Sequence, residues 1–400
     1  MVLLTPGPTP VPMPVREAMA RPMIHHRTPE FEAITRAMSG KLAQVFQTSN
    51  PVVTIPGSGT TACESALLSL VHPRDIVATF SNGKFGARWA EVFRRVGLDV
   101  FIDDIPIEAP WGEAMDPGRL ERFLESEVGR RAAIFTLVHC ETSAATTNDL
   151  QLLARMIRER RQDAVIIADC ITSIGAIPMN PDEWGIDVAV CASQKALRNA
   201  PGLGFVSVSE RARERMSHGS RLAPISMNLG SYLKGHANGR LPFTAPVSNI
   251  VAQDVALDLI LAEGLDAIHQ RTALLARATR EALTAMGLPL ASSAPADPVT
   301  AVRMPEGSRE GLADEVRSVC KESSGVLMAG GQGPWSGQVI RLSHMGAVTC
   351  ADTIAGVEAI ASALKVLGPI EGADPDAGVE SIRAGLRAGL ESESSARVAV

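Results

Sequence analysis

Two titratable residues stand where apolar runs of the sequence end. The run Val165–Ala168 is followed by Asp169, and the run Val188–Ala192 is followed three residues later by Lys195. A carboxylate in an apolar setting needs a partner, because its desolvation is costly. A lysine in a partly desolvated pocket has a lowered pKa and becomes an amine nucleophile. Taken singly, each residue also has an ordinary explanation, as a helix N-cap for the aspartate or a strand-end ion pair for the lysine.

A glycine-rich turn supplies a third element. Residues 56–64 (PGSGTTACE) follow an apolar run, and Thr61 and Glu64 have the spacing of a capping box at a helix start. Free N–H groups at such a start bind phosphate, although an unliganded turn has the same pattern. The turn also matches the dinucleotide fingerprint, which requires an acid after the next strand, about 20 residues on. Asp75 precedes the apolar run Ile76–Phe80, so the fit is incomplete.

Together, the three elements match the needs of one cofactor. Pyridoxal phosphate needs a lysine for its aldehyde, an acid facing its pyridine nitrogen and an anion site for its phosphate. Lys195, Asp169 and the turn at 57–62 meet these needs in combination. A dinucleotide-dependent oxidoreductase remains the alternative from another enzyme class.

These residues would be positioned by alternating strands and helices. The predicted helices have apolar residues at helical spacing, and several of the predicted strands are apolar almost throughout, as is typical of strands buried on both faces. The alternation predicts an α/β fold whose large domain has a mostly parallel seven-stranded sheet flanked by helices, with ligands at the carboxyl ends of the strands. The expected strands are Val52–Ile55, Ile76–Phe80, Leu98–Ile102, Ala132–Val138, Val165–Ala168, Val188–Ala192 and Leu203–Val208. The expected helices are Thr61–Leu70, Arg88–Val96, Leu120–Glu127, Leu150–Arg161 and Ile250–Ala262.

The last third of the chain predicts a smaller C-terminal α/β domain. Its expected helices are Ala267–Met286 and Leu312–Lys321, and its expected strands are Val299–Met304, Gly325–Met328 and Val339–Leu342. The predicted division is 1–258 for the N-terminal segment and large domain, 259–368 for the small domain and 369–400 for a polar tail. The composition of that tail is compatible with a loose helix or with disorder.

Composition narrows the class of protein. The 400-residue chain has a net charge of −6, which argues against a large nucleic-acid footprint. It has no signal-like start and no apolar run of the roughly 18 residues that a membrane helix needs, and we expect a cytoplasmic protein. The six scattered cysteines include no Cys-x-x-Cys pair, so we expect buried free thiols and no metal site.

The sequence resembles the class V aminotransferases of pyridoxal-phosphate fold type I, especially the alanine/serine–glyoxylate branch. The resemblance runs from about Leu4 to Leu367 and is carried by seven segments in the family's order. They are TPGP at 5–8, GSGT at 57–60, SNGKFG at 81–86, HCET at 139–142, DCITSIG at 169–175, SQKAL at 193–197 and RLSHMG at 341–346.

The resemblance implies a role for each matching residue. Lys195 would carry the cofactor as an aldimine (Schiff base) and move the substrate proton, and Asp169 would pair with the pyridine nitrogen. Arg341 would bind the substrate carboxylate. Thr244 would reach the phosphate of a neighbouring subunit, which implies a homodimer. The other residues implied to bind the cofactor are Ser58, Gly59, Thr60, Phe85, Thr142, Ile171 and Gln194.

The implied reaction transfers an amino group from serine, alanine or a similar donor to glyoxylate or pyruvate. Departures from the family leave the substrate open: Leu241 replaces a usual tyrosine, and residues 143–145 (SAA) replace a usual small-Thr-Gly run. Transamination of 2-aminoethylphosphonate with pyruvate is the near alternative. A cysteine-dependent lyase is a weaker one, since Cys320 and Cys350 fall in or beside predicted helices. His344 is equally compatible with packing or with the site, whereas residues 25–27 (HHR) favour a solvated or structural cluster over a contact with substrate or phosphate.

Overall fold

A seven-stranded sheet forms the centre of the larger part of the molecule. The computed structural model describes residues 1–72, 75–95, 107–217 and 222–391. Every strand pair in the large sheet is parallel except those made by β10, which runs antiparallel to both neighbours. In spatial order the strands are β2 (Val52–Pro56), β10 (Leu203–Val208), β9 (Val188–Ala192), β8 (Val165–Asp169), β5 (Ala132–Val138), β3 (Ile76–Ser81) and β4 (Ile107–Glu108). The predicted mostly parallel seven-stranded sheet is confirmed, while the expected strand Leu98–Ile102 lies outside the described residues.

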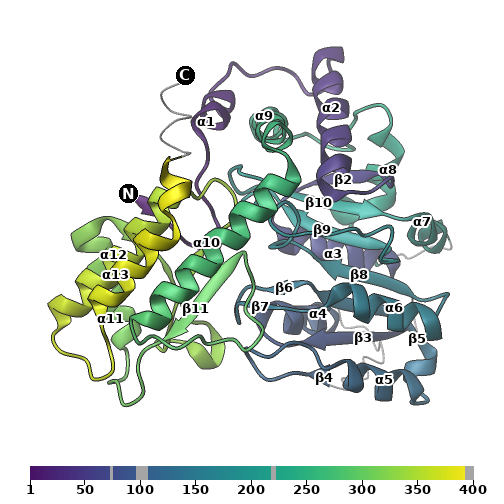
Figure 1. Cartoon of the computed structure of the whole chain (residues 1–400). Coiled ribbons are helices and arrows are strands. Elements are labelled where there is room, and N and C mark those ends of the chain that lie inside the picture. Colours follow the sequence, from purple (N-terminus) through teal and green to yellow (C-terminus); the bar gives the residue numbers. More distant parts are fainter. Residues whose placement is uncertain (73–74, 96–106, 218–221, 392–400) are drawn as a thin grey trace.

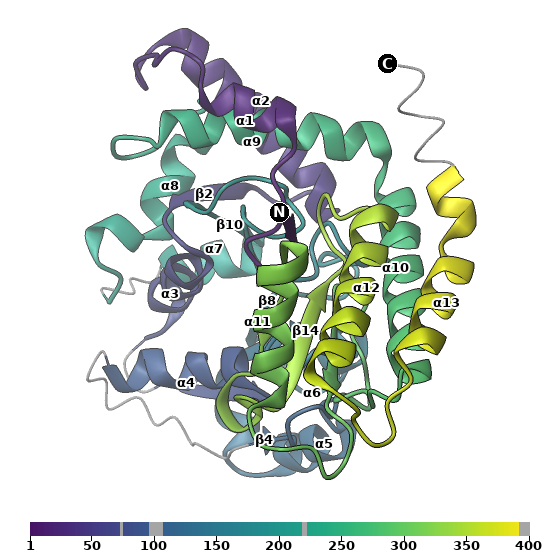
Figure 2. The same ribbon diagram turned by 90° about the vertical axis from the view of Figure 1, so that its left-hand side faces the viewer.

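Helices cover both faces of this sheet (Figures 1 and 2). Alternate strand residues point to opposite faces; Ile166 and Ala168 pack in one core, and Val165 and Ile167 in the other. One core takes side chains from α2 (Pro29–Phe46), α5 (Pro117–Glu125), α6 (Leu150–Arg160) and α9 (Val247–Glu263). The other takes them from α3 (Gly59–Leu70), α4 (Lys84–Arg95), α7 (Glu210–Ser217) and α8 (Leu229–His236). Burial on both faces explains why these strands are almost wholly apolar.

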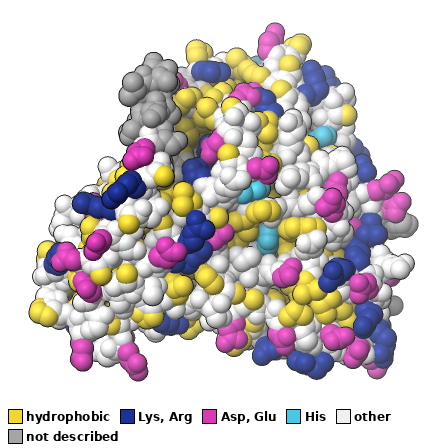
Figure 3. Space-filling model, viewed as in Figure 1, with side chains coloured by type: hydrophobic (Ala, Val, Ile, Leu, Met, Phe, Trp, Pro, Cys, Tyr) yellow, Lys and Arg dark blue, Asp and Glu magenta, His cyan; other side chains and the backbone are white. Residues whose placement is uncertain are grey.

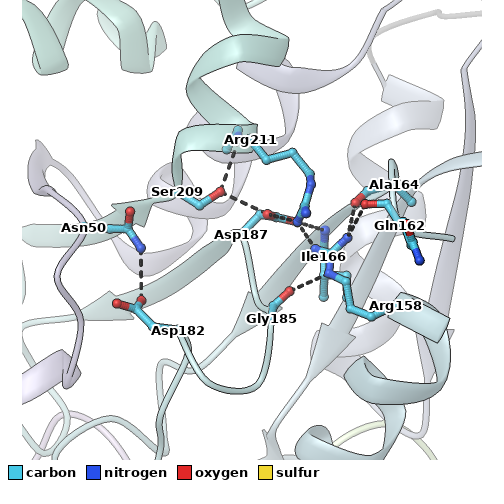
Figure 4. Close-up of polar contacts among 11 residues, drawn as sticks. Asn50, Arg158, Gln162, Ala164, Ile166, Asp182, Gly185, Asp187, Ser209 and Arg211 are labelled. Carbon is cyan, nitrogen blue, oxygen red and sulfur yellow. Dashed lines mark hydrogen bonds and ion pairs between the residues drawn. The ribbon is translucent and has the colours of Figure 1, made fainter.

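A buried aspartate ties two strands together at the start of β9 (Figure 4). Asp187 accepts hydrogen bonds from the backbone N–H of Ile166 at 2.8 Å and from Ser209 Oγ at 3.0 Å. It also pairs with Arg158 and, at 2.9 Å, with Arg211. This cluster supplies hydrogen-bond and ion-pair partners for the buried carboxylate. It lies at the amino ends of β8 and β9, opposite the strands' carboxyl ends.

The C-terminal part forms a second core around an antiparallel sheet. Its three strands, in the order β11 (Val299–Arg303), β14 (Val339–Ser343) and β13 (Ala329–Gly330), pack with helices that lie side by side in Figure 1. These helices are α10 (Leu265–Ala285), α11 (Leu312–Ser324), α12 (Cys350–Leu367) and α13 (Pro375–Gly385). Short 3-10 helices are η1 (Gly129–Arg131), η2 (Ile225–Met227) and η3 (Gly333–Trp335).

The chain ends join this second core in ways the sequence patterns did not predict. The strand expected at Gly325–Met328 shortens to β12 (Val326–Leu327), which pairs with β1 (Val2–Leu3) and not with the three-stranded sheet. From β1 the chain leads to α1 (Met13–Met19), which packs on α9. Part of the tail is not disordered, because α13 buries Ile382 and its C-cap residue Leu386. Val379 and Leu390 also pack against this core, so the segment docks through apolar residues spaced three or four positions apart.

Acidic and basic side chains are interspersed over the face seen in Figure 3. No helix within the described ranges is both long and apolar enough to cross a membrane.

Candidate active site

A cavity of about 310 Å³ lies at the carboxyl ends of β2, β8 and β9. It is lined by residues that follow these strands, as expected for ligand sites of open α/β sheets. The sequence-predicted residues in its lining are Ser58, Gly59, Thr60, Phe85, Thr142, Asp169, Ile171, Gln194 and Lys195. The structure therefore brings nine predicted residues together, while Arg341 and Thr244 are not part of the lining.

The side chain of Lys195 lies buried under the N-terminal segment. Its Nζ donates a hydrogen bond to the carbonyl oxygen of Pro6, and Thr9 Oγ1 donates to the carbonyl of Lys195 at 2.8 Å. A Cβ on Gly7 would lie 2.7 Å from Nζ, so only glycine allows this approach. Burial lowers the pKa of Lys195 to about 8 because desolvation disfavours the ammonium form. The amine is therefore much easier to deprotonate than an exposed lysine.

Asp169 ends β8 and is also buried. Its Oδ1 accepts a hydrogen bond from the backbone N–H of Ile171 at 3.0 Å. The pKa of Asp169 is raised to about 6, mainly by burial and to a smaller extent by the nearby Glu141 carboxylate, against the opposing effect of that hydrogen bond. A carboxyl group with this pKa is mostly ionised at neutral pH. A cationic or protonated partner would stabilise the ionised form strongly.

The N-terminus of α3 forms an anion cradle at the same cavity. Ser58 Oγ accepts from the N–H of Thr61 at 3.3 Å, and Thr61 Oγ1 accepts from the N–H of Ser58, which makes a capping box. The box expected from Thr61 and Glu64 is thus wrong: the helix begins earlier, at Gly59. The N–H groups of Gly59 and Thr60 lie in the first turn, where the helix offers no acceptors, so they can donate to a phosphate.

An arginine that was not singled out from the sequence lies at this cradle. Arg88 lines the cavity, and its Nη1 donates to Thr60 Oγ1 at 2.8 Å. Its guanidinium carbon is 4.8 Å from the centroid of the Phe85 ring, which also lines the cavity. Residues three apart on a helix share a face, so the spacing of Phe85 and Arg88 could have indicated this neighbour.

The first turn of α4, which carries Phe85, is held by a buried carboxylate. Glu141 Oε2 accepts from the backbone N–H groups of Phe85 and Gly86, both at 2.9 Å. Its Oε1 accepts from Ser143 Oγ at 2.6 Å, and Ser143 Oγ in turn accepts from the N–H of Lys84 at 2.9 Å. A carboxylate at a helix N-terminus complements the helix dipole. Glu141 lies in the short hairpin of β6 (Cys140–Glu141) and β7 (Thr146–Thr147).

Arg341, from β14, joins the second core to the cavity wall. It is buried, and its Nη1 donates to the carbonyl of Thr142 at 2.8 Å while its Nε donates to that of Gly330 at 2.8 Å. Burial lowers the pKa of Arg341 to about 10. Thr142 Oγ1 shares a hydrogen bond of 2.6 Å with Thr172 Oγ1, inside the same wall. The guanidinium therefore lies directly behind a residue of the cavity.

Other residues considered from the sequence lie elsewhere. Thr244 is exposed at the surface. His344 is buried, with Nε2 2.8 Å from Thr300 Oγ1, as a packed histidine. Arg27 donates to the carbonyl of Leu241 at 3.1 Å, which gives it a structural contact.

All six cysteines are free and buried, as expected. The parts of the chain that the structure describes contain no group of three or more His, Cys, Asp or Glu side chains able to hold a metal.

The cavity's chemistry fits pyridoxal phosphate. A buried amine of lowered pKa, a buried acid and an anion cradle line one space. Gln194 also lines it, and its Oε1 is buried without a hydrogen-bond partner among the described residues. Buried polar atoms are usually satisfied by protein, water or ligand.

Known proteins resemble this chain in sequence and in fold. Residues 3–346 match the family model for class V aminotransferases. A relative from Paracoccus denitrificans, named L-aspartate–glyoxylate aminotransferase, is 32% identical, with 92% of each chain covered. A Synechococcus relative named as the small subunit of a soluble hydrogenase is 38% identical, with coverage of 92% of this chain and 94% of its own. The crystal structure of pyridoxamine–pyruvate aminotransferase from Mesorhizobium loti superposes with a TM-score of 0.89 at 28% identity, covering 97% of both chains.

The fold and these similarities define a fold type I aminotransferase. The chain belongs to the class V aminotransferases. Family membership replaces the dinucleotide interpretation of residues 57–62, and the resemblance inferred from seven sequence segments is confirmed.

Proposed function

We propose that this chain is a pyridoxal-phosphate-dependent aminotransferase that moves an amino group from a small amino acid, such as serine or alanine, to glyoxylate or pyruvate. The observation that carries the proposal is the convergence of Lys195, Asp169 and the α3 N-terminus on one cavity. Two similar proteins, L-aspartate–glyoxylate aminotransferase and pyridoxamine–pyruvate aminotransferase, are named for glyoxylate and pyruvate, which supports this class of acceptor.

Each residue contributes a defined step. Bound pyridoxal phosphate supplies an electron sink for the charge left at the substrate Cα. Asp169 would keep the pyridine nitrogen protonated. The resulting ion pair would also compensate the desolvation of the Asp169 carboxylate. Lys195 Nζ would hold the cofactor aldehyde until the substrate amine displaces it, and the released amine, with its lowered pKa, would then take the proton from Cα as a general base. The cradle of Ser58, Gly59 and Thr60 holds the phosphate, with Gln194 beside it.

The remaining assigned residues orient the reactants. Phe85 and Ile171, which line the cavity, would pack on the cofactor ring, and Thr142 would bond its hydroxyl group. Arg341 binds the substrate carboxylate at the wall beside Thr142.

The functional unit we propose is a homodimer in which Thr244 of each chain contacts the phosphate held by the other. Thr244 is exposed, and Phe243 beside it is 37% exposed despite its apolar ring. The exposed position of Thr244 leaves its hydroxyl accessible to a second chain, as the resemblance to the class V aminotransferases implies.

An absorption experiment tests the proposal and names the donor. The purified protein, supplied with pyridoxal phosphate, should show a visible band that the Lys195→Ala variant lacks. Serine, alanine, glycine, aspartate, pyridoxamine and 2-aminoethylphosphonate are then added one at a time, and the true donor bleaches the band. Bleaching by 2-aminoethylphosphonate alone would select the alternative aminotransferase. A protein that forms no band at all would overturn the proposal.

Turnover of the same variant gives a second check. Lys195→Ala should abolish transamination while its melting temperature stays close to that of the parent protein. Unchanged turnover would remove Lys195 from the mechanism.

A further inference from the structure

The charges around the cavity are unevenly distributed. Among the described residues that line it, the charged side chains are Arg88, Asp169 and Lys195. Under the proposed function, Asp169 is paired with the pyridine nitrogen and Lys195 with the cofactor aldehyde. The phosphate end is then left with neutral donors from Ser58, Gly59, Thr60 and Gln194, and with Arg88.

A phosphate monoester carries about −1.5 to −2 charges at neutral pH. Neutral N–H and O–H donors solvate such a charge, and the helix dipole adds a fractional positive charge of roughly 0.5. These contributions leave most of the charge uncompensated in a partly buried site, where an unpaired charge is costly. A guanidinium is the side chain best suited to a phosphate.

The contacts of Arg88 direct it to this end of the cavity. Its Nη1 donates to Thr60 Oγ1 at 2.8 Å, and Thr60 belongs to the first turn of α3. Because Thr60 Oγ1 accepts this bond, its own hydroxyl hydrogen stays available to donate into the cradle. The Phe85 ring, 4.8 Å from the guanidinium carbon, restrains Arg88 further through a cation–π contact.

We propose that Arg88 is a cofactor-binding residue that supplies the positive charge for the phosphate and orients the Thr60 hydroxyl toward it. This role rests on the proposed function, since it requires pyridoxal phosphate as the cofactor. It makes the phosphate group, and not only the aldehyde and ring, a large part of what the apoprotein recognises.

Equilibrium titration of the full-length apoprotein tests this role without measuring activity. Pyridoxal phosphate and pyridoxal, which lacks the phosphate, are each titrated while the visible band is followed. The parent protein should prefer pyridoxal phosphate strongly. Arg88→Gln should bind pyridoxal phosphate roughly 10- to 100-fold more weakly, as expected for a lost charge-assisted bond, and should bind pyridoxal unchanged. Arg88→Lys should retain an intermediate affinity, since it keeps the charge but loses the fork.

A matched control lies on the same helix. Arg95 pairs with Glu91 on the exposed side of α4 and lies outside the cavity lining, so Arg95→Gln should leave both affinities unchanged. Equal weakening of both ligands in Arg88→Gln, or no weakening of either, would overturn the role. A parent protein that binds pyridoxal as tightly as pyridoxal phosphate would also overturn it while leaving the aminotransferase proposal intact. A parent protein that binds neither ligand would overturn both.

Discussion

Burial acts on Lys195 and Asp169 in opposite directions, and both effects favour the proposed chemistry. The lysine pKa falls to about 8 and the aspartate pKa rises to about 6, in each case mainly through desolvation. Desolvation always favours the neutral form, so it lowers the pKa of a base and raises that of an acid. The site therefore provides an amine that is easily deprotonated. It also provides a carboxylate that accepts a hydrogen bond strongly from a protonated partner.

The lysine pKa predicts how cofactor capture depends on pH. Attack on the aldehyde requires neutral Nζ, whose population grows as pH rises through about 8 and then levels off. For an unperturbed lysine, with a pKa near 10.4, the population of neutral amine would keep growing for about two more pH units. The rate of band formation after mixing apoprotein with pyridoxal phosphate should thus reach its plateau near pH 9. A rate still rising steeply at pH 10 would contradict the lowered pKa.

Arg341 should act on substrates that carry a carboxylate. Replacing it with alanine removes a charged partner and should lower kcat/KM by roughly 10- to 100-fold, a larger effect than the weakening of pyridoxal phosphate binding that follows from the lost contact with Thr142. Steady-state kinetics and the cofactor titration separate these effects. Arg303→Ala, on the neighbouring strand and stacked on Trp335, is the control. Parent-like kinetics in Arg341→Ala would remove this residue from the substrate site.

At the scale of elements, helix α4 depends on a carboxylate from outside the helix. Glu141 binds the N–H groups of Phe85 and Gly86 and is buried, so its desolvation is offset by these bonds and by Ser143. Burial raises the pKa of Glu141, against the opposing effect of those bonds. Because the same helix carries Phe85 and Arg88, its position decides where both meet the cavity.

The substitution Glu141→Gln tests this dependence. The side-chain amide of glutamine accepts hydrogen bonds only through its oxygen, whereas both carboxylate oxygens of Glu141 accept. Either the N–H groups of Phe85 and Gly86 or the Ser143 hydroxyl would therefore lose its acceptor. The free energy of unfolding should fall by about 1–3 kcal/mol, and pyridoxal phosphate should bind more weakly as Phe85 shifts. Chemical denaturation and cofactor titration measure the two effects. Glu91→Gln, on the exposed side of α4, should change neither, and a parent-like Glu141→Gln would show that the cap is dispensable.

At the scale of the molecule, two large apolar side chains, Met23 and Ile225, are left exposed. Met23 and Ile225 are 71% and 77% exposed. The N-terminal segment containing Met23 contacts the segment before Thr244 through the bond from Arg27 to Leu241. The proposed homodimer requires that a second copy of the chain cover the exposed Thr244, so that this side chain reaches the cavity of the other chain.

Mixed dimers test the proposed sharing of sites. Light scattering should give twice the chain mass of 42.3 kDa, and Thr244→Val should weaken pyridoxal phosphate binding about tenfold. Exchanging subunits between Thr244→Val and Lys195→Ala creates one site with both residues intact, so tight binding should return. Thr284→Val, on the exposed side of α10, is the control. A monomeric protein, or no recovery on mixing, would contradict the shared site.

The sequence alone determined where most strands and most cavity residues lie along the chain. Apolar runs indicate strands that are buried on both faces. Because parallel strands share a direction, the residues that follow them lie together at the carboxyl ends of the strands. Asp169, Lys195 and the turn at 57–62 could therefore be grouped before any distance was known.

Only the tertiary structure decided the contacts between distant segments. No local pattern predicts that Gly7 lies over Lys195, that β1 pairs with β12, or that β10 runs antiparallel. The same holds for the contact of Arg341 with Thr142 and for Arg88 at the cradle. Periodicity reports which face of an element is buried, whereas these contacts depend on how whole elements pack against one another, which is set by the complementary shapes of both cores.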